Sequence, residues 1–167
     1  KDESNPKAGT QIGILIPRDI KIEPLRILAI GNSFTISLMN HNFFPEAIKS
    51  AGENIEIEVM YIGGCPLERH WKNIEKADDE NFKPYVIAHN IGDKKRYNAN
   101  IPQMLKAAEW DIVTIQQVSH MSFKPETYEP YTTKIVDTIR KACPRAQIVF
   151  QQTWAYTTVG NRIQSVG

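Results

Sequence analysis

The chain has 167 residues, which is enough for one domain and too few for two domains of ordinary size. Its 20 basic and 19 acidic residues leave a net charge of +1, so it lacks the basic surface of non-specific nucleic-acid binding proteins. Hydrophobic residues make up 41% of the chain, which excludes wholesale disorder, and no apolar run approaches the ~20 residues that span a bilayer. We therefore predict no nucleic-acid partner and no membrane span.

The first part of the chain differs in composition from the rest. Residues 1–24 are expected to form a polar tail, with a short apolar edge segment at 12–16 that ends at Pro17. Because the chain begins with Lys1 rather than Met, it is interpreted as a processed or trimmed sequence. The domain itself is predicted to occupy residues 25–167.

The domain is predicted to start with a strand and a helix. Residues 25–30 are a nearly continuous apolar run, which is typical of a strand buried on both faces. Residues 33–51 have apolar side chains at helical spacing. Pro45 either kinks this helix or lies in the first turn of a shorter one, and Gly52 fits its C-terminal cap.

The middle of the chain continues the alternation. Residues 55–62 are rich in β-formers and predict a second strand, and residues 66–74 predict a short helix that begins with a proline. A turn-like segment between residues 85–89 and 95–97 predicts a small β-hairpin insertion. Residues 101–109 are expected to form a helix.

Residues 111–115 predict a third buried strand, residues 128–142 an amphipathic helix, and residues 147–150 a fourth strand. The remainder, residues 153–167, is polar and loop-like. Strands that alternate with helices predict an α/β fold, a three-layer sandwich in which helices cover both faces of a mainly parallel sheet. Ligands of such sheets bind outside the carboxyl ends of the strands, so the residues that follow each strand are the candidates for chemistry.

Ser33 follows the first strand directly and stands at the start of a helix. The free N–H groups and partial positive charge of a helix N-terminus stabilise a developing negative charge, and a serine there can be a nucleophile if a base reaches it. The alternative is that Ser33 is only the N-cap of the helix, because serine is preferred at that position.

Other candidates occupy the equivalent positions after the later strands. Gly63 and Gly64 would let a backbone N–H approach a ligand closely, or they form a simple turn. Gln116 and Gln117 end the third strand, and a glutamine amide can donate to an oxyanion or satisfy nearby backbone groups. Because strand side chains alternate between faces, only one of the two can point toward the site.

None of the four histidines has the spacing of a metal-binding cluster, so no metal and no cofactor is predicted. His120 could serve as a local base, or it is a surface residue. His70 could line a pocket, or it is exposed beside a packed Trp71.

Cys65 and Cys143 fall at opposite edges of the predicted sheet. That is too far apart for a disulfide, so both are predicted to be free thiols.

Three motifs occur in order along the chain, each at the end of a predicted strand: G-N-S-F at residues 31–34, G-G-C-x-L-E-x-H-W at 63–71 and W-D-x-x-x-x-Q-Q-x-S at 110–119. Taken together they resemble the SGNH (GDSL-like) hydrolase superfamily, and more narrowly a bacterial branch whose substrates are largely uncharacterised. The resemblance covers roughly residues 25–154. It implies a flavodoxin-like sheet and ester hydrolysis by a serine nucleophile.

The resemblance also implies roles for individual residues. Ser33 would be the nucleophile, and its N–H, the Gly64 N–H and a side-chain amide would form the oxyanion hole. The superfamily usually supplies that amide from an Asn in a G-x-N-D motif that this sequence lacks; Gln117 is the first substitute and Gln116 the second. The usual Asp beside the nucleophile is Asn32 here. The expected substrate is a small-molecule or glycan ester, such as an acetylated carbohydrate.

One part of the superfamily's machinery is missing. Its base comes from an Asp-x-x-His motif near the C-terminus, and none of the four histidines here stands in such a motif. We therefore expect this chain to be the N-terminal portion of a longer hydrolase domain, with a sheet truncated after the fourth strand and little activity of its own.

A second hypothesis is a non-catalytic glycan-binding or structural module on the same fold, with aromatic stacking faces such as Trp71, Trp154 and Tyr61. The resembled branch is often exported, so an extracytoplasmic location is expected. A truncated sheet would expose a hydrophobic edge, which makes a homo-oligomer a further expectation.

Overall fold

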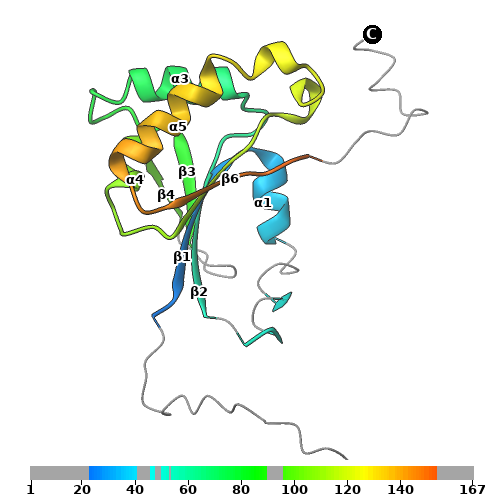
Figure 1. The fold of residues 1–167 in the computed structure, drawn as a ribbon. Coiled ribbons are helices and arrows are strands. Elements are labelled where there is room, and N and C mark those ends of the chain that lie inside the picture. The colour runs from blue at the N-terminus through cyan, green and yellow to red at the C-terminus, as the bar shows by residue number, and fades with distance from the viewer. Residues whose placement is uncertain (1–22, 41–45, 48–49, 53, 90–95, 154–167) are drawn as a thin grey trace, which may run out of the picture.

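The computed structural model describes residues 23–40, 46–47, 50–52, 54–89 and 96–153. The expected edge segment at 12–16, Pro45 and Trp154 lie outside these residues. The elements alternate along the chain as predicted (Figure 1). They are β1 (Leu25–Gly31), α1 (Ser33–Asn40), β2 (Ile55–Tyr61), α3 (Leu67–Glu75), β3 (Tyr85–His89), β4 (Arg96–Ala99), α4 (Ile101–Leu105), β5 (Ile112–Ile115), the 3-10 turns η1 (Ser119–Met121) and η2 (Pro125–Thr127), α5 (Tyr131–Ala142) and β6 (Gln147–Phe150).

One sheet of six strands runs through the described part of the chain, in the order β4-β3-β2-β1-β5-β6. The strands β2, β1, β5 and β6 are parallel, whereas β3 and β4 are antiparallel to their neighbours. The predicted β-hairpin is thus confirmed, and it extends the sheet at the β2 edge. The mainly parallel, three-layer α/β fold is confirmed as well.

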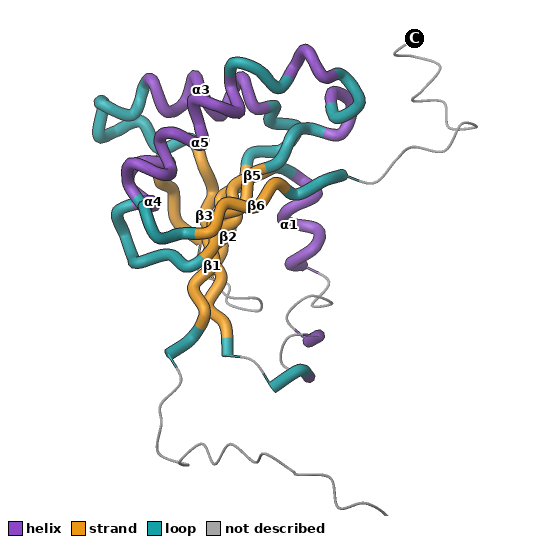
Figure 2. The backbone as a smooth tube through the Cα atoms, in the orientation of Figure 1, coloured by secondary structure: helices purple, strands orange, loops and turns teal. Residues whose placement is uncertain are grey.

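Helices lie on both faces of the sheet. The helices α3, α4 and α5 lie together on one face and α1 lies on the other, as Figures 1 and 2 show. The larger core cluster fills the first face, where Leu28, Met60 and Val113 meet Ile135 and Ile139 of α5. A smaller cluster under α1 contains Ile27, Ile57, Val59 and Ile36. Alternate residues of β1 therefore serve the two cores, which is why this strand reads as a nearly continuous apolar run.

Within the helix expected over 33–51, the described residues are helical at 33–40 in α1 and again at 46–47 and 50. Two other predicted helices differ in length from the structure. The helix expected over 101–109 ends at Leu105, because the Met104 carbonyl accepts hydrogen bonds from the Trp110 indole N–H at 2.8 Å and from the capping Lys106 N–H. The helix expected over 128–142 starts at Tyr131, directly after Pro130, whose ring nitrogen has no hydrogen to donate.

Candidate active site

The candidate residues gather at the carboxyl ends of the parallel strands. The ends of β1 and β2 are joined there by a hydrogen bond from the Ile62 N–H to the Gly31 carbonyl, at 3.3 Å. The segment that starts α1 and the Gly63-Gly64 turn therefore lie side by side. The fold thus brings the first two motifs of the sequence to one edge of the sheet.

Ser33 is the first residue of α1, and its side chain is exposed. Asn32, not Ser33, caps the helix: the Asn32 Oδ1 accepts the Phe34 N–H at 3.1 Å, and its carbonyl accepts the Ile36 N–H at 3.2 Å. The alternative interpretation of Ser33 as the N-cap is therefore wrong. Among the residues that the structure describes, neither the hydroxyl nor the N–H of Ser33 has a hydrogen-bond partner.

Asn32 also fixes the neighbouring turn. Its side chain is fully buried, and its Nδ2 donates to the Cys65 carbonyl at 3.4 Å. Gly64 has a φ of +62°, a conformation that glycine adopts without strain, and both Gly63 and Gly64 are exposed. One asparagine thus holds the start of α1 against the turn that presents the Gly64 N–H.

Gln117 does not occupy the role first assigned to it. It is buried, its Oε1 accepts the Leu67 N–H at 3.1 Å and the Val118 N–H at 2.8 Å, and its Nε2 donates to the Thr127 carbonyl and hydroxyl. The amide nitrogen of Gln117 thus already has acceptors on Thr127 of η2. We therefore assign Gln117 to the tethering of the loop after β5 and not to an oxyanion hole.

Gln116 points to the other face, as the alternation of strand side chains predicts. It is 1% exposed, and its Oε1 accepts the Thr35 hydroxyl at 2.9 Å. Its Nε2 is buried and has no hydrogen-bond partner in the described part of the chain. Of the two candidate amides, Gln116 is thus the one with a free donor beneath the first turn of α1.

Thr35 is a site residue outside the three motifs, and it lies against Gly31, the first residue of the G-N-S-F motif. A Cβ at Gly31 would lie 2.0 Å from the Thr35 Oγ1, so only glycine leaves room for this hydroxyl. Gly31 is needed for this close approach, since it is the last residue of β1 and not part of a left-handed turn. The feature of the sequence that could have indicated Thr35 is its position in the first turn of the helix that follows the first strand.

His70 is a core residue of α3, contrary to both interpretations offered from the sequence. It is 2% exposed, its ring stacks on Tyr85 with centroids 5.6 Å apart, and its Nδ1 lies 2.7 Å from the Tyr85 hydroxyl. Burial lowers the pKa of His70 to about 3, with the nearby Arg69 charge adding to the effect. His70 is therefore neutral and closed off from the candidate site.

His120 is exposed in η1, and no described contact links it to Ser33. No other residue of the described ranges places a base in hydrogen-bond contact with the Ser33 hydroxyl. Within these ranges, no group of three potential metal ligands comes together. No helix in the same ranges is long and apolar enough to cross a membrane.

Both cysteines are free and buried, which confirms the prediction of two thiols. Burial raises the pKa of the Cys65 thiol to about 12, against a smaller opposing effect of the Arg69 charge. Cys65 is thus a packed residue and a poor nucleophile, although it follows Gly64 in the chain.

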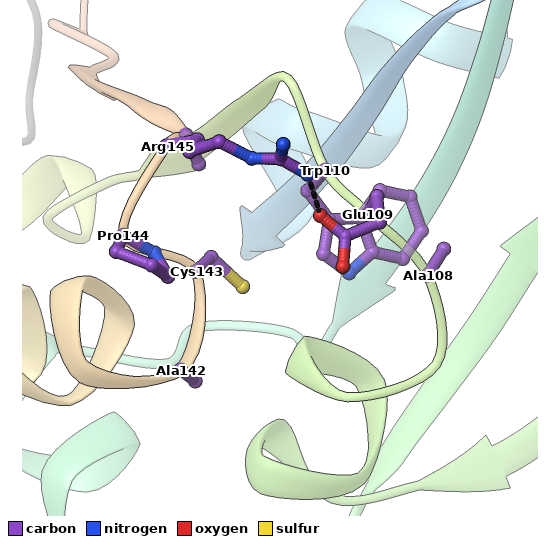
Figure 3. A pocket seen from close by; sticks show the side chains of 8 residues that line it. Ala108, Glu109, Trp110, Ala142, Cys143, Pro144 and Arg145 are labelled. Atoms are coloured by element: carbon purple, nitrogen blue, oxygen red, sulfur yellow. Dashed lines mark hydrogen bonds and ion pairs between the residues drawn. The ribbon is translucent and has the colours of Figure 1, made fainter.

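A cavity of about 280 Å³ lies at the opposite edge of the sheet, before β5 and β6. Trp110 and Cys143 line it, and the exposed ion pair of Glu109 with Arg145 closes one side (Figure 3). The indole N–H and the thiol both donate to backbone carbonyls of α4. Because these polar groups already have partners, the cavity offers little for ligand recognition, and it is separate from the Ser33 edge.

Two solved structures share this fold. The crystal structure of a DUF4886 family protein from Bacteroides uniformis matches with a TM-score of 0.73 and 30% sequence identity, over 86% of this chain and 56% of that chain. A protein from Slackia heliotrinireducens, provisionally described as an SGNH hydrolase, matches with a TM-score of 0.55 and 21% identity, over 86% of this chain and 64% of that chain. The chain thus spans between half and two thirds of their lengths.

The family of the chain follows from a match over most of its length. The family of domains of unknown function designated DUF4886 matches residues 26–164, and the chain belongs to it. A search of curated proteins found no match.

Proposed function

We propose that this chain carries the nucleophile of a serine hydrolase of the SGNH type, which acts on esters. The observation that carries the proposal is the state of Ser33: it is exposed at the first position of α1 with a free hydroxyl, while Asn32 provides the cap. The fold shared with the Slackia protein supports the proposal.

In the proposed mechanism, the Ser33 Oγ attacks the ester carbonyl, the alcohol leaves, and water then hydrolyses the acyl-enzyme. The N–H groups of Ser33 and Gly64 would stabilise the oxyanion, with the field of the α1 N-terminus behind them. The base would come from a part of the protein outside the described residues. We propose an acylated carbohydrate as substrate and an extracytoplasmic location.

The test is turnover of p-nitrophenyl acetate by the full-length protein. We expect Ser33→Ala to lower kcat by about a thousand-fold or more, because the covalent step is lost. Ser37→Ala, at an exposed serine of the same helix, is the matched control and should stay within about two-fold of wild type. Equal turnover by Ser33→Ala and wild type would contradict the proposal. Release of acetate from acetylated oligosaccharides tests the substrate class.

A second candidate is a glycan-binding module without catalysis. It is favoured by the lack of any described base in contact with the Ser33 hydroxyl. In that case the full-length protein would bind oligosaccharides, as measured by calorimetry, with equal affinity before and after Ser33→Ala, and it would hydrolyse no ester.

A further inference from the structure

We propose that Thr35 is a positioning residue for the Ser33 nucleophile, because its buried hydroxyl ties the first turn of α1 to the carboxyl end of β5. The inference rests on the function proposed above for Ser33. It assigns a role to a residue that does not itself touch the substrate.

The hydroxyl of Thr35 lies near two glutamine oxygens, one directly after β5 and one directly after β6. Thr35 is 1% exposed, and its Oγ1 lies 2.9 Å from the Gln116 Oε1 and 3.4 Å from the Gln151 Oε1. A hydroxyl has a single hydrogen, so it donates to the nearer oxygen, that of Gln116. Buried hydrogen bonds of this kind fix geometry, since breaking one leaves a polar atom without a partner.

The neighbouring backbone is shaped around this contact. The 2.0 Å separation between a Cβ at residue 31 and the Thr35 Oγ1 means that β1 must end in glycine for the contact to form. The Gln116 Oε1 lies only 3.3 Å from the same Cβ position. The end of β1, the first turn of α1 and the end of β5 are therefore packed tightly at this point.

Ser33 is held from both sides of β1. On the β2 side, the Asn32 Nδ2 donates to the Cys65 carbonyl, and on the β5 side, Thr35 donates to Gln116. The strand order β2-β1-β5 places these two tethers on opposite flanks of the strand from which α1 emerges. The helix packs against β1 and β2, and the Thr35 hydroxyl provides a hydrogen bond that links its first turn to the β5 side.

Two tethers matter because a nucleophile must be placed accurately. A displacement of about 1 Å at a reacting atom can cost about a hundred-fold in rate. Loss of the Thr35 tether lets the first turn of α1 pivot about Asn32, and the Ser33 Oγ moves with it. The effect falls on the chemical step more than on substrate binding.

The experiment compares Thr35→Val, which keeps the shape and removes the hydroxyl, with Thr35→Ser, which keeps the hydroxyl. Thr138→Val is the control. The Thr138 hydroxyl donates to the Lys134 carbonyl within α5, at 2.8 Å, and Thr138 lies far from Thr35 in the sequence. The full-length proteins are assayed on p-nitrophenyl acetate for kcat and KM. Amide hydrogen exchange of Phe34 and Ile36 is followed by NMR in the same proteins.

We expect Thr35→Val to lower kcat about ten-fold or more, with KM within about two-fold, and to speed exchange at both amides about ten-fold. Thr35→Ser should restore both quantities to within about three-fold of wild type, and Thr138→Val should change neither.

Unchanged amide exchange in Thr35→Val would overturn the tether, whether or not the protein is active. An unchanged kcat, in a protein that Ser33→Ala inactivates, would overturn the positioning role and leave the proposed function intact. Full activity in Ser33→Ala would overturn the proposed function, and with it the positioning role.

Discussion

Asn32 shows how one side chain can decide the role of its neighbour. Its oxygen caps α1 and its nitrogen donates to the Cys65 carbonyl, so both ends of a fully buried amide have partners. Because the cap is filled, Ser33 is left free at the first helical position. An asparagine fits this double role better than an aspartate, which has no N–H group to donate to a carbonyl.

His70 permits a prediction about pH at the same scale. Its pKa is about 3 in the folded protein and about 6.5 when unfolded, so between these values the unfolded chain binds more protons. The stability that neutral His70 contributes is therefore present above pH 6.5 and is lost as the pH falls toward 3. The margin by which wild type is more stable than His70→Phe should shrink by about 2 kcal/mol between pH 7 and pH 5.

Urea unfolding of both proteins at the two pH values measures this margin. The difference between wild type and His70→Phe cancels the contributions of other titrating groups. One of them is Glu58, whose pKa is raised by burial. Trp71→Phe, at a half-buried neighbour on α3 that does not titrate, is the control. A margin that stays constant from pH 7 to pH 5 would show that His70 is accessible to protons in the folded state.

At the scale of elements, the loop after β5 is held by a dense set of hydrogen bonds. Gln117 joins the Leu67 N–H at the start of α3 to Thr127 in η2, and the Tyr128 hydroxyl donates to the Ser122 carbonyl at 2.7 Å. The loop is therefore fixed to the segment that follows the Gly63-Gly64 turn. This connection orders one side of the candidate site.

We predict that Gln117→Ala lowers the free energy of unfolding by about 2–4 kcal/mol, because two buried N–H groups, those of Leu67 and Val118, lose their acceptor. Gln152→Ala, at an exposed glutamine of the same edge, should change it by less than about 0.5 kcal/mol. Urea unfolding monitored by tryptophan fluorescence is the measurement. A loss of stability as small as that of Gln152→Ala would mean that water replaces Gln117 as the acceptor for the Leu67 and Val118 N–H groups.

At the scale of the whole molecule, the sheet ends in a parallel strand. β6 pairs with β5 on one side, and within the described residues no strand pairs with its other side. Phe150 is 38% exposed at its end. Unpaired strand edges are templates for association, so this edge is where we expect a second copy or a further part of the protein to bind.

We predict that residues 1–167, prepared alone, self-associate at micromolar concentration through this edge. Val149→Lys should shift the chain toward monomer, because a lysine on an edge strand opposes pairing with another strand. Thr133→Lys, on the exposed side of α5, controls for the added charge. Light scattering after gel filtration measures the mass, and a monomeric wild-type chain would contradict the prediction.

Much of the architecture could be predicted from local patterns. The apolar run of β1, the alternation around Gln116 and Gln117 and the proline before α3 are properties of short segments, and each was reflected in the structure. The helix ends were less predictable. The end of α4 depends on the Trp110 indole, which reaches the Met104 carbonyl only because the chain folds back there.

The sequence by itself determined the order of elements, the parallel sheet and the edge at which Ser33 stands, because hydrophobic periodicity and turn residues act locally. Only the tertiary structure decided which glutamine amide keeps a free donor and what the Thr35 hydroxyl holds. Those choices depend on hydrogen bonds between residues far apart in the chain, 81 positions for Thr35 and Gln116 and 50 for Leu67 and Gln117. No local pattern encodes such pairings, since a polar side chain selects its partner from whatever the packed strands bring within reach.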